Sequence, residues 1–187
     1  EIIFSFVKEN LPAFDKLIVS DYRHGLISKE LANRLVRLAK ETDKPIYVDS
    51  QVAQNFGNHK WYVGANLFCL NEKEALSIDR EFNNASLEES LARLSKILGG
   101  ADIILKLGER GSVSIIRGRY IATEPYRVEA VDTIGAGDAF FAVLALTPHM
   151  GLENYLKLAN VWAALAVTVK GAHPPTLEML KNASIRY

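Results

Sequence analysis

The sequence predicts an α/β fold with a mostly parallel sheet, organised as one domain over residues 1–187. Short β-branched apolar runs alternate with amphipathic segments of about 10–15 residues, which is the pattern of βαβ units. The apolar runs indicate strands that are covered on both faces. Several of these runs end in a residue with a carboxylate or amide side chain, or in a glycine. Those positions are the carboxyl ends of the strands, where ligands bind in such sheets.

The first half of the chain predicts three strands and two helices. The strands are 16–22, 45–50 and the part of 65–75 that ends at Asn71, and the helices are 28–42 and 86–98. Ser28 and Ser86 are the expected N-caps, and Glu89 stands in the capping-box position. Gly99 and Gly100 are expected to stop the second helix.

The second half predicts a strand, a glycine turn, a strand, a turn and a short strand over 101–123. Helices follow at about 136–147, 152–170 and 176–183, with Pro174 and Pro175 separating the last two. Parallel sheets bind ligands beyond the carboxyl ends of their strands. Four residues are expected at those ends: Asp21, Asp49, Asn71 and Gly108.

Composition excludes several classes of function. Lys and Arg number 22 and Asp and Glu number 22, so no net charge favours nucleic acid or an anionic membrane as a partner. The apolar run 161–169 is too short to cross a bilayer. The single cysteine, Cys69, is expected in the core, and its lack of a partner fits a reducing, cytoplasmic setting. The histidines lack metal-ligand spacing and are expected in loops or at the surface, with no structural metal: His24, His59, His149 and His173.

Residues 131–143, VDTIGAGDAFFAV, place two glycines and an alanine at the start of an apolar helix. Helix N-termini carry unpaired N–H groups and partial positive charge, so Gly135, Ala136 and Gly137 predict an anion hole for a phosphoryl group. Asp138 in the first turn would lie beside it and suits a general base. The alternative is a glycine turn before a helix whose first-turn Asp complements the helix dipole.

The segment 132–138, DTIGAGD, resembles the D-T-x-G-A-G-D signature of the ribokinase/PfkB family of sugar kinases. Residues 71–74, NEKE, are similar to the family's N-x-x-E motif. Residues 106–111, KLGERG, and 159–172, ANVWAALAVTVKGA, resemble the family's nucleotide-side turn and helix. The resemblance implies a ribokinase-like three-layer α/β/α fold and ATP-dependent phosphorylation of a hydroxyl on a sugar or sugar phosphate.

The resemblance also implies roles for particular residues. Asp138 would be the general base, with Gly135, Ala136 and Gly137 around the phosphoryl group, and Asn71 and Glu74 would help to hold Mg²⁺. The resemblance further implies that six residues bind the nucleotide: Lys106, Gly108, Gly111, Asn160, Gly171 and Asp132. Purely structural alternatives remain: Asn71 ending a strand before an exposed helical Glu74, Gly108 and Gly111 in a hairpin turn, Lys106 ending a strand, and Asp132 forming a turn.

Within the family, residues 20–28, SDYRHGLIS, and 48–51, VDSQ, are most similar to the heptose-phosphate kinases. His24 stands where that branch commonly has Lys, and Ser50 where proline is usual. The chain resembles only the later part of a family member, so we expect the C-terminal portion of a longer kinase, with a natural short form as the alternative. The sugar-binding positions and the lid, through which a homodimer could form, would then lie mostly elsewhere.

Two further functions remain open at this point. One is a kinase of the same superfamily that acts on a nucleoside or a vitamin-type alcohol. The other is a non-catalytic nucleotide-binding module descended from such a kinase. A dinucleotide-binding dehydrogenase is disfavoured, because no G-x-G-x-x-G follows the first strand.

Overall fold

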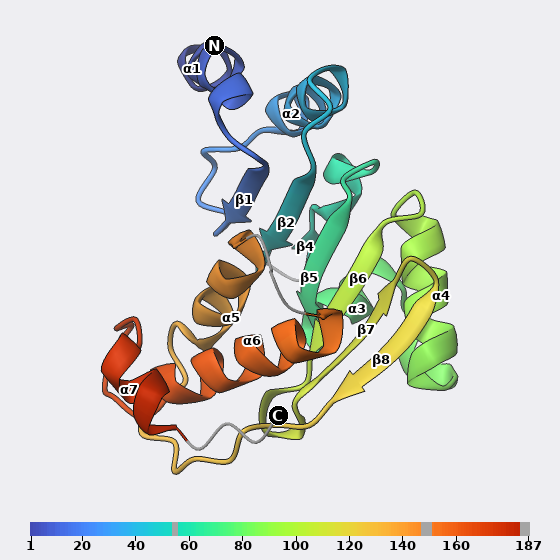
Figure 1. The fold of residues 1–187 in the computed structure, drawn as a ribbon. Helices are drawn as coiled ribbons and strands as arrows, with labels where there is room; N and C mark the ends of the chain where they lie inside the picture. Colours follow the sequence, from blue (N-terminus) through green and yellow to red (C-terminus); the bar gives the residue numbers. More distant parts are fainter. Residues whose placement is uncertain (54–55, 147–150, 184–187) are drawn as a thin grey trace. The chain divides into compact units, whose positions relative to one another are not determined.

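The computed structural model describes residues 1–53, 56–146 and 151–183, and its ribbon is drawn in Figure 1. The chain forms two compact units. The first unit consists of residues 1–105 and 114–120, and the second of residues 106–113 and 121–187. The organisation of the chain as one domain stays a prediction.

The main sheet has six strands in the order β1-β2-β5-β6-β7-β8. They are β1 (Leu17–Asp21), β2 (Ile46–Ser50), β5 (Leu67–Asn71), β6 (Asp102–Lys106), β7 (Ser112–Ile116) and β8 (Arg119–Thr123). The pairs β1–β2 and β2–β5 are parallel, with Leu17 opposite Ile46 and Tyr47 opposite Leu67. A separate antiparallel pair consists of β3 (Val52–Ala53) and β4 (Phe56–Gly57).

The central strands are apolar because both of their faces are covered, as the sequence predicted. Val48, Phe68, Leu70 and Ile103 are fully buried, each with no exposed surface. Cys69 is equally buried and is a core residue, which confirms its expected place. Val48, Phe68 and Ile103 are β-branched or aromatic, so they favour the extended backbone as well as the core.

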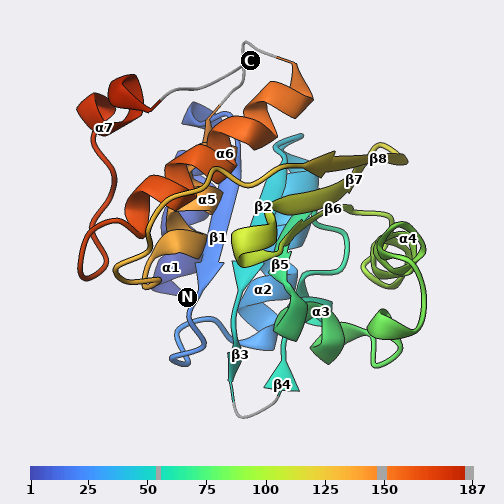
Figure 2. The same cartoon turned by 90° about the horizontal axis from the view of Figure 1, so that it is seen from below.

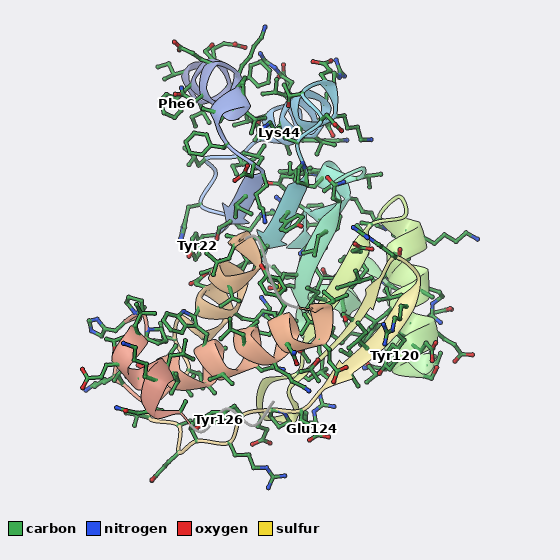
Figure 3. All side chains as sticks on the ribbon, in the orientation of Figure 1. Phe6, Tyr22, Lys44, Tyr120, Glu124 and Tyr126 are labelled. Carbon is green, nitrogen blue, oxygen red and sulfur yellow. The ribbon has the colours of Figure 1, made fainter. Side chains whose placement is uncertain are left out.

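The helices of the first unit are α1 (Ile2–Asn10), α2 (Lys29–Glu41), α3 (Glu72–Ile78) and α4 (Leu87–Ile97). Both predicted caps are present. The Ser28 hydroxyl oxygen accepts from Leu31 N–H at 3.2 Å, and Ser86 and Glu89 form a capping box. No sequence pattern predicted α1, and none of its residues is buried; Phe6, labelled in Figure 3, is 66% exposed.

The helices of the second unit are α5 (Ala136–Ala145), α6 (Leu152–Ala166) and α7 (Leu177–Asn182). Figure 2 shows α5 and α6 packed side by side, and the Tyr155 hydroxyl donates to Leu146 O at 2.8 Å. The prediction of a helix over 152–170 was too long. The helix ends at Ala166, because Val167 O accepts hydrogen bonds from Val131 N–H and Asp132 N–H instead of a helical amide.

The strand, turn and strand pattern of 101–123 is also confirmed. Arg117 and Gly118 join β7 to β8 in a two-residue turn, with φ of 51° and 75°. Both residues are left-handed, as expected for the hairpin turn that matches the twist of its strands. Within the described ranges, none of the helices is both long and apolar enough to cross a membrane.

Candidate active site

The glycine-rich segment of the second unit forms a tight entry into α5. Gly135 is the N-cap, and its backbone is left-handed with φ of 84° and ψ of −5°. A Cβ at this position would lie 3.3 Å from both Cα and Cβ of Ala172. Glycine is therefore favoured here twice, by the backbone conformation and by the close approach of the loop that follows α6.

The first amides of α5 differ in what they bind. Ala136 N–H donates to Thr133 O at 3.3 Å and so closes the turn. Gly137 N–H and Asp138 N–H donate to no acceptor among the residues that the structure describes. Because these two amides open a helix, they carry its partial positive charge and are available to an anion. Of the three predicted amides, the one at Ala136 is thus already engaged.

Two charged side chains stand at this helix start. Asp138 is exposed in the first turn of α5. No hydrogen bond or ion pair of its carboxylate is formed with the described part of the chain. Lys106, the last residue of β6, reaches Gly137: its Nζ lies 3.4 Å from the position that a Cβ there would occupy. A carboxylate and an ammonium group therefore flank the open amides.

Asp132 ties this segment to the loop that follows α6. Its Oδ1 accepts from Ile134 N–H at 3.0 Å, and its Oδ2 accepts from Gly171 N–H at 2.9 Å. These hydrogen bonds favour the ionised form, so they lower the pKa of the Asp132 carboxyl below its ordinary value. The structure thus brings together Asp132, the glycine segment and Gly171, which are far apart in the sequence.

Gly108 and Gly111 lie in the turn between β6 and β7, as the sequence predicted. Leu107 N–H donates to Gly111 O at 2.8 Å across this turn. Gly111 has φ of 84°, and a Cβ on it would collide with the backbone oxygen of Thr123. The turn therefore presents bare backbone, and a side chain at Gly111 cannot be accommodated.

Asn160 is buried on α6 and is 8% exposed. Its Nδ2 donates to Ser112 Oγ at 3.1 Å and to the backbone oxygen of Glu124 at 3.3 Å. Glu124 is labelled in Figure 3. The amide thus links α6 to β7 and to the segment that follows β8.

In the first unit, Asn71 and Glu74 form a reciprocal capping box at the start of α3. Asn71 Oδ1 accepts from Glu74 N–H at 2.9 Å, and Glu74 Oε2 accepts from Asn71 N–H at 2.7 Å. Glu74 is 4% exposed, so the alternative of an exposed helical Glu is wrong. A carboxylate and an amide at the end of β5 are hard oxygen donors, which fit Mg²⁺ reached through water. Within the described ranges, no group of three or more His, Cys, Asp or Glu side chains is arranged so that it could hold a metal ion.

A second polar cluster was only partly anticipated. Asp21 ends β1, as predicted, and its Oδ2 accepts from Asn58 Nδ2 at 2.7 Å and from the Tyr62 hydroxyl at 3.0 Å. Asn58 Oδ1 in turn accepts from the Ser50 hydroxyl at 2.5 Å. All four side chains are buried. No sequence pattern singled out Asn58 or Tyr62, because their roles depend on a carboxylate 37 and 41 residues away.

The exposure of the histidines differs in part from the prediction. His59 is 1% exposed, so the expectation of a loop or surface side chain is wrong for it. It lies in the short helix η2 (His59–Tyr62), between Asn58 and the buried Tyr62. His24 and His173 are exposed, as expected, and His149 lies outside the described residues.

Comparison with solved structures shows the fold. Phosphofructokinase-2 from Escherichia coli, crystallised with potassium, matches 98% of this chain with a TM-score of 0.76 and 18% identity. Ribokinase from Arabidopsis thaliana, complexed with ribose and ATP, matches 96% of it with a TM-score of 0.73 and 20% identity. The chain spans 61% and 59% of those two proteins. The fold is therefore ribokinase-like α/β, as predicted.

Comparison with curated proteins identifies relatives by sequence. The bifunctional protein HldE of Desulfatibacillum aliphaticivorans is 31% identical over 180 residues, and that of Campylobacter jejuni subsp. jejuni is 29% identical over 185. The alignments cover 91% and 96% of this chain but only 35% and 39% of those proteins. A profile described as pfkB family carbohydrate kinase matches residues 8–179. The chain therefore belongs to the pfkB family of carbohydrate kinases.

Proposed function

We propose that this chain carries the phosphoryl-transfer site of an ATP-dependent kinase whose acceptor is the hydroxyl of a sugar or sugar phosphate. The observation that carries the proposal is the start of α5. There Gly137 N–H and Asp138 N–H make no hydrogen bond to the described residues, and the Asp138 carboxylate and Lys106 ammonium flank them. Family membership over residues 8–179 supports the same reaction.

Each group at the start of α5 has a task in this reaction. Gly135 and Gly137 let the γ-phosphoryl of ATP approach the backbone, and the amides of Gly137 and Asp138 stabilise its charge. Asp138 accepts the proton of the acceptor hydroxyl as that oxygen attacks phosphorus and the bond to the ADP oxygen breaks. Lys106 offsets the negative charge of the phosphoryl oxygens. The products are ADP, the phosphorylated acceptor and a protonated Asp138 that returns its proton to water.

The remaining predicted residues would bind the nucleotide and its metal ion. The backbone of the Gly108–Gly111 turn, Asn160 and the Gly171 loop would line the nucleotide, with Asp132 holding that loop in place. Asn71 and Glu74 would bind Mg²⁺ through water. The ion, when bound, neutralises phosphate charge.

We propose a sugar phosphate of the heptose type as the acceptor. The resemblance of residues 20–28 to heptose-phosphate kinases and the HldE relatives support this choice. A cytoplasmic setting agrees with the single buried cysteine. A homodimer of the longer protein remains part of the proposal, and the balanced charge supports no nucleic-acid partner.

The test is Asp138→Asn in the full-length protein, assayed for ATP-dependent phosphorylation across a panel of sugars and sugar phosphates. Loss of the base is expected to lower kcat by about 10²–10⁴-fold, with ATP binding retained. Asp43→Asn is the matched control, because Asp43 is exposed and left-handed, a conformation that asparagine tolerates. A folded Asp138→Asn enzyme with normal turnover would refute the assigned base. ATP binding without turnover by the unaltered protein would instead favour the nucleotide-binding module.

A further inference from the structure

The first unit contains a cavity of about 530 Å³ that no function has been assigned to. It lies at the amino ends of β2, β5 and β6, which Pro45, Asn66 and Ala101 immediately precede. This is the edge of the sheet opposite to Asp21 and Asn71, which end β1 and β5. The cavity is thus separate from the strand ends where ligands of such sheets normally bind.

Bare backbone keeps this cavity open. Gly64 and Gly99, both on its wall, have φ of 98° and 83°. A Cβ on Gly99 would lie 3.4 Å from Gly64 N and 3.1 Å from Val63 Cγ1. A Cβ on Gly64 would lie 2.5 Å from Lys40 Nζ. The absence of a side chain at Gly64 therefore leaves room for the Lys40 ammonium group, and its absence at Gly99 lets the backbone of Gly64 approach.

Two cations line the cavity, Lys40 from α2 and Arg117 from the turn between β7 and β8. Neither side chain forms a hydrogen bond or ion pair with the residues that the structure describes. The acid on the wall, Asp102, accepts from the backbone N–H of Arg117 at 2.7 Å, which fixes the turn and leaves the guanidinium uncommitted. Two unpaired cations thus face one carboxylate, and the cavity carries a net positive charge.

Tyr47 adds a neutral donor to the same wall. One face of its ring is covered by Lys16, whose Nζ lies 5.1 Å from the ring centroid. Burial raises the pKa of the Tyr47 phenol, the charge of Asp102 raises it further, and Arg117 lowers it. The phenol therefore stays protonated near neutral pH and can donate a hydrogen bond beside the Arg117 guanidinium.

We propose that this cavity is a second ligand site, which binds a small metabolite by its oxyanion group through Lys40 and Arg117. Arginine presents a planar fork of donors and lysine a mobile point charge, a combination that suits phosphate or carboxylate oxygens. The volume falls in the range of sites that hold small molecules rather than single ions, about 300–1,000 Å³. The ligand is thus a phosphorylated or carboxylated compound, bound at the edge of the sheet opposite to Asn71.

The test uses the full-length protein labelled with ¹⁵N-glycine and titrated with pyrophosphate or with citrate. The chain described here has 12 glycines. Gly64, Gly99 and Gly100 report on the cavity, whereas Gly135 and Gly137 report on the start of α5.

Saturable shifts of the three cavity resonances are the expected result. Preference for pyrophosphate over citrate would identify a phosphate ligand, and the reverse would identify a carboxylate. Shifts confined to Gly135 and Gly137 would overturn this proposal while leaving the kinase proposal intact.

Charge-removing variants make the test specific. The Lys40→Gln, Arg117→Gln double variant is expected to weaken binding at the cavity by at least about tenfold, equivalent to 1.4 kcal/mol. Lys44→Gln is the matched control, because it removes a positive charge four residues from Lys40 without touching the cavity wall; Lys44 is labelled in Figure 3. Unshifted glycine resonances elsewhere will confirm that the variants fold. Equal weakening by Lys44→Gln and by the double variant would show a diffuse charge effect and refute the site.

Discussion

The carboxylate of Asp132 accepts a hydrogen bond from the backbone N–H of Gly171, 39 residues along the chain, at 2.9 Å. Its other oxygen accepts from Ile134 N–H at 3.0 Å, so a single side chain holds two loops of the second unit. Gly135, one residue further on, approaches Ala172 so closely that a Cβ would be 3.3 Å away. The position of the amides at the start of α5 therefore depends on this contact.

Removing the contact is predicted to weaken nucleotide binding. Asp132→Ala should raise the Kd for ATP by between about tenfold and one-hundredfold, because small displacements of positioning groups have large effects. Asp132→Asn keeps one acceptor oxygen and should lie between Asp132→Ala and the unaltered protein. Calorimetric titration with ATP measures both variants. Wild-type affinity in Asp132→Ala would show that the two loops hold their places without this carboxylate.

Substitutions at two glycines, Gly111 and Gly118, can separate the cost of backbone strain from the cost of a steric collision. Gly111→Ala should destabilise the protein by about 3 kcal/mol or more, because φ is 84° and a Cβ would collide with Thr123 O. Gly118→Ala is the control, since its φ is 75° but nothing lies within 4 Å of a Cβ. It should cost only about 1–2 kcal/mol, the left-handed penalty alone. Urea unfolding measures both values, and equal losses would contradict the predicted collision.

The buried Tyr62 hydroxyl predicts a dependence of stability on alkaline pH. Tyr62→Phe should cost about 1–3 kcal/mol near neutral pH, because Asp21 loses a buried donor. Burial, and then the charge of Asp21, raises the pKa of the Tyr62 phenol in the folded state. The hydroxyl's contribution is therefore complete below the unfolded tyrosine pKa of about 10 and declines as the pH rises above it.

The measurement is the free energy of unfolding of both proteins between about pH 7 and pH 11. The advantage of the unaltered protein over Tyr62→Phe should shrink across the alkaline part of this range. Tyr126→Phe is the control, because that tyrosine makes no hydrogen bond to a carboxylate among the described residues; it is labelled in Figure 3. A constant difference at all pH values would rule out a raised pKa at Tyr62.

Substitutions at Glu74 can separate its role in the helix cap from its proposed role in binding Mg²⁺. Glu74→Gln keeps an oxygen that can accept from Asn71 N–H, but its amide nitrogen cannot accept from Asn71 Nδ2, which donates to the other carboxylate oxygen at 2.8 Å. The free energy of unfolding should therefore fall by about 1–3 kcal/mol. The lost charge should raise the Mg²⁺ concentration needed for half-maximal activity by about tenfold. Glu74→Ala should reduce stability further, because both hydrogen bonds from Asn71 to this side chain are then lost. An unchanged Mg²⁺ requirement in Glu74→Gln would leave Glu74 with its capping role alone.

Features of this protein that depend on neighbouring residues were predictable from the sequence. The caps Ser28 and Ser86 and the glycine entry to α5 each depend on groups within about one helical turn, whose spacing is visible in the chain. The central strands were predicted from short runs of apolar residues. The turn at Gly108 and Gly111 was predicted for the same reason. The roles of the residues at the start of α5 were predicted from the glycines at the helix N-terminus and from the family resemblance, and they stay predictions.

Only the tertiary structure determined the groups that meet across long stretches of chain. Asp21 meets Asn58 and Tyr62, Asn160 meets Ser112, and Lys40 meets Gly64, and no local pattern marks any of these pairs. The end of α6 at Ala166 was likewise set by Val131 and Asp132, which bond to Val167 O. Local sequence fixes backbone conformation over a few residues, whereas buried polar partners are selected by the packing that brings distant segments together.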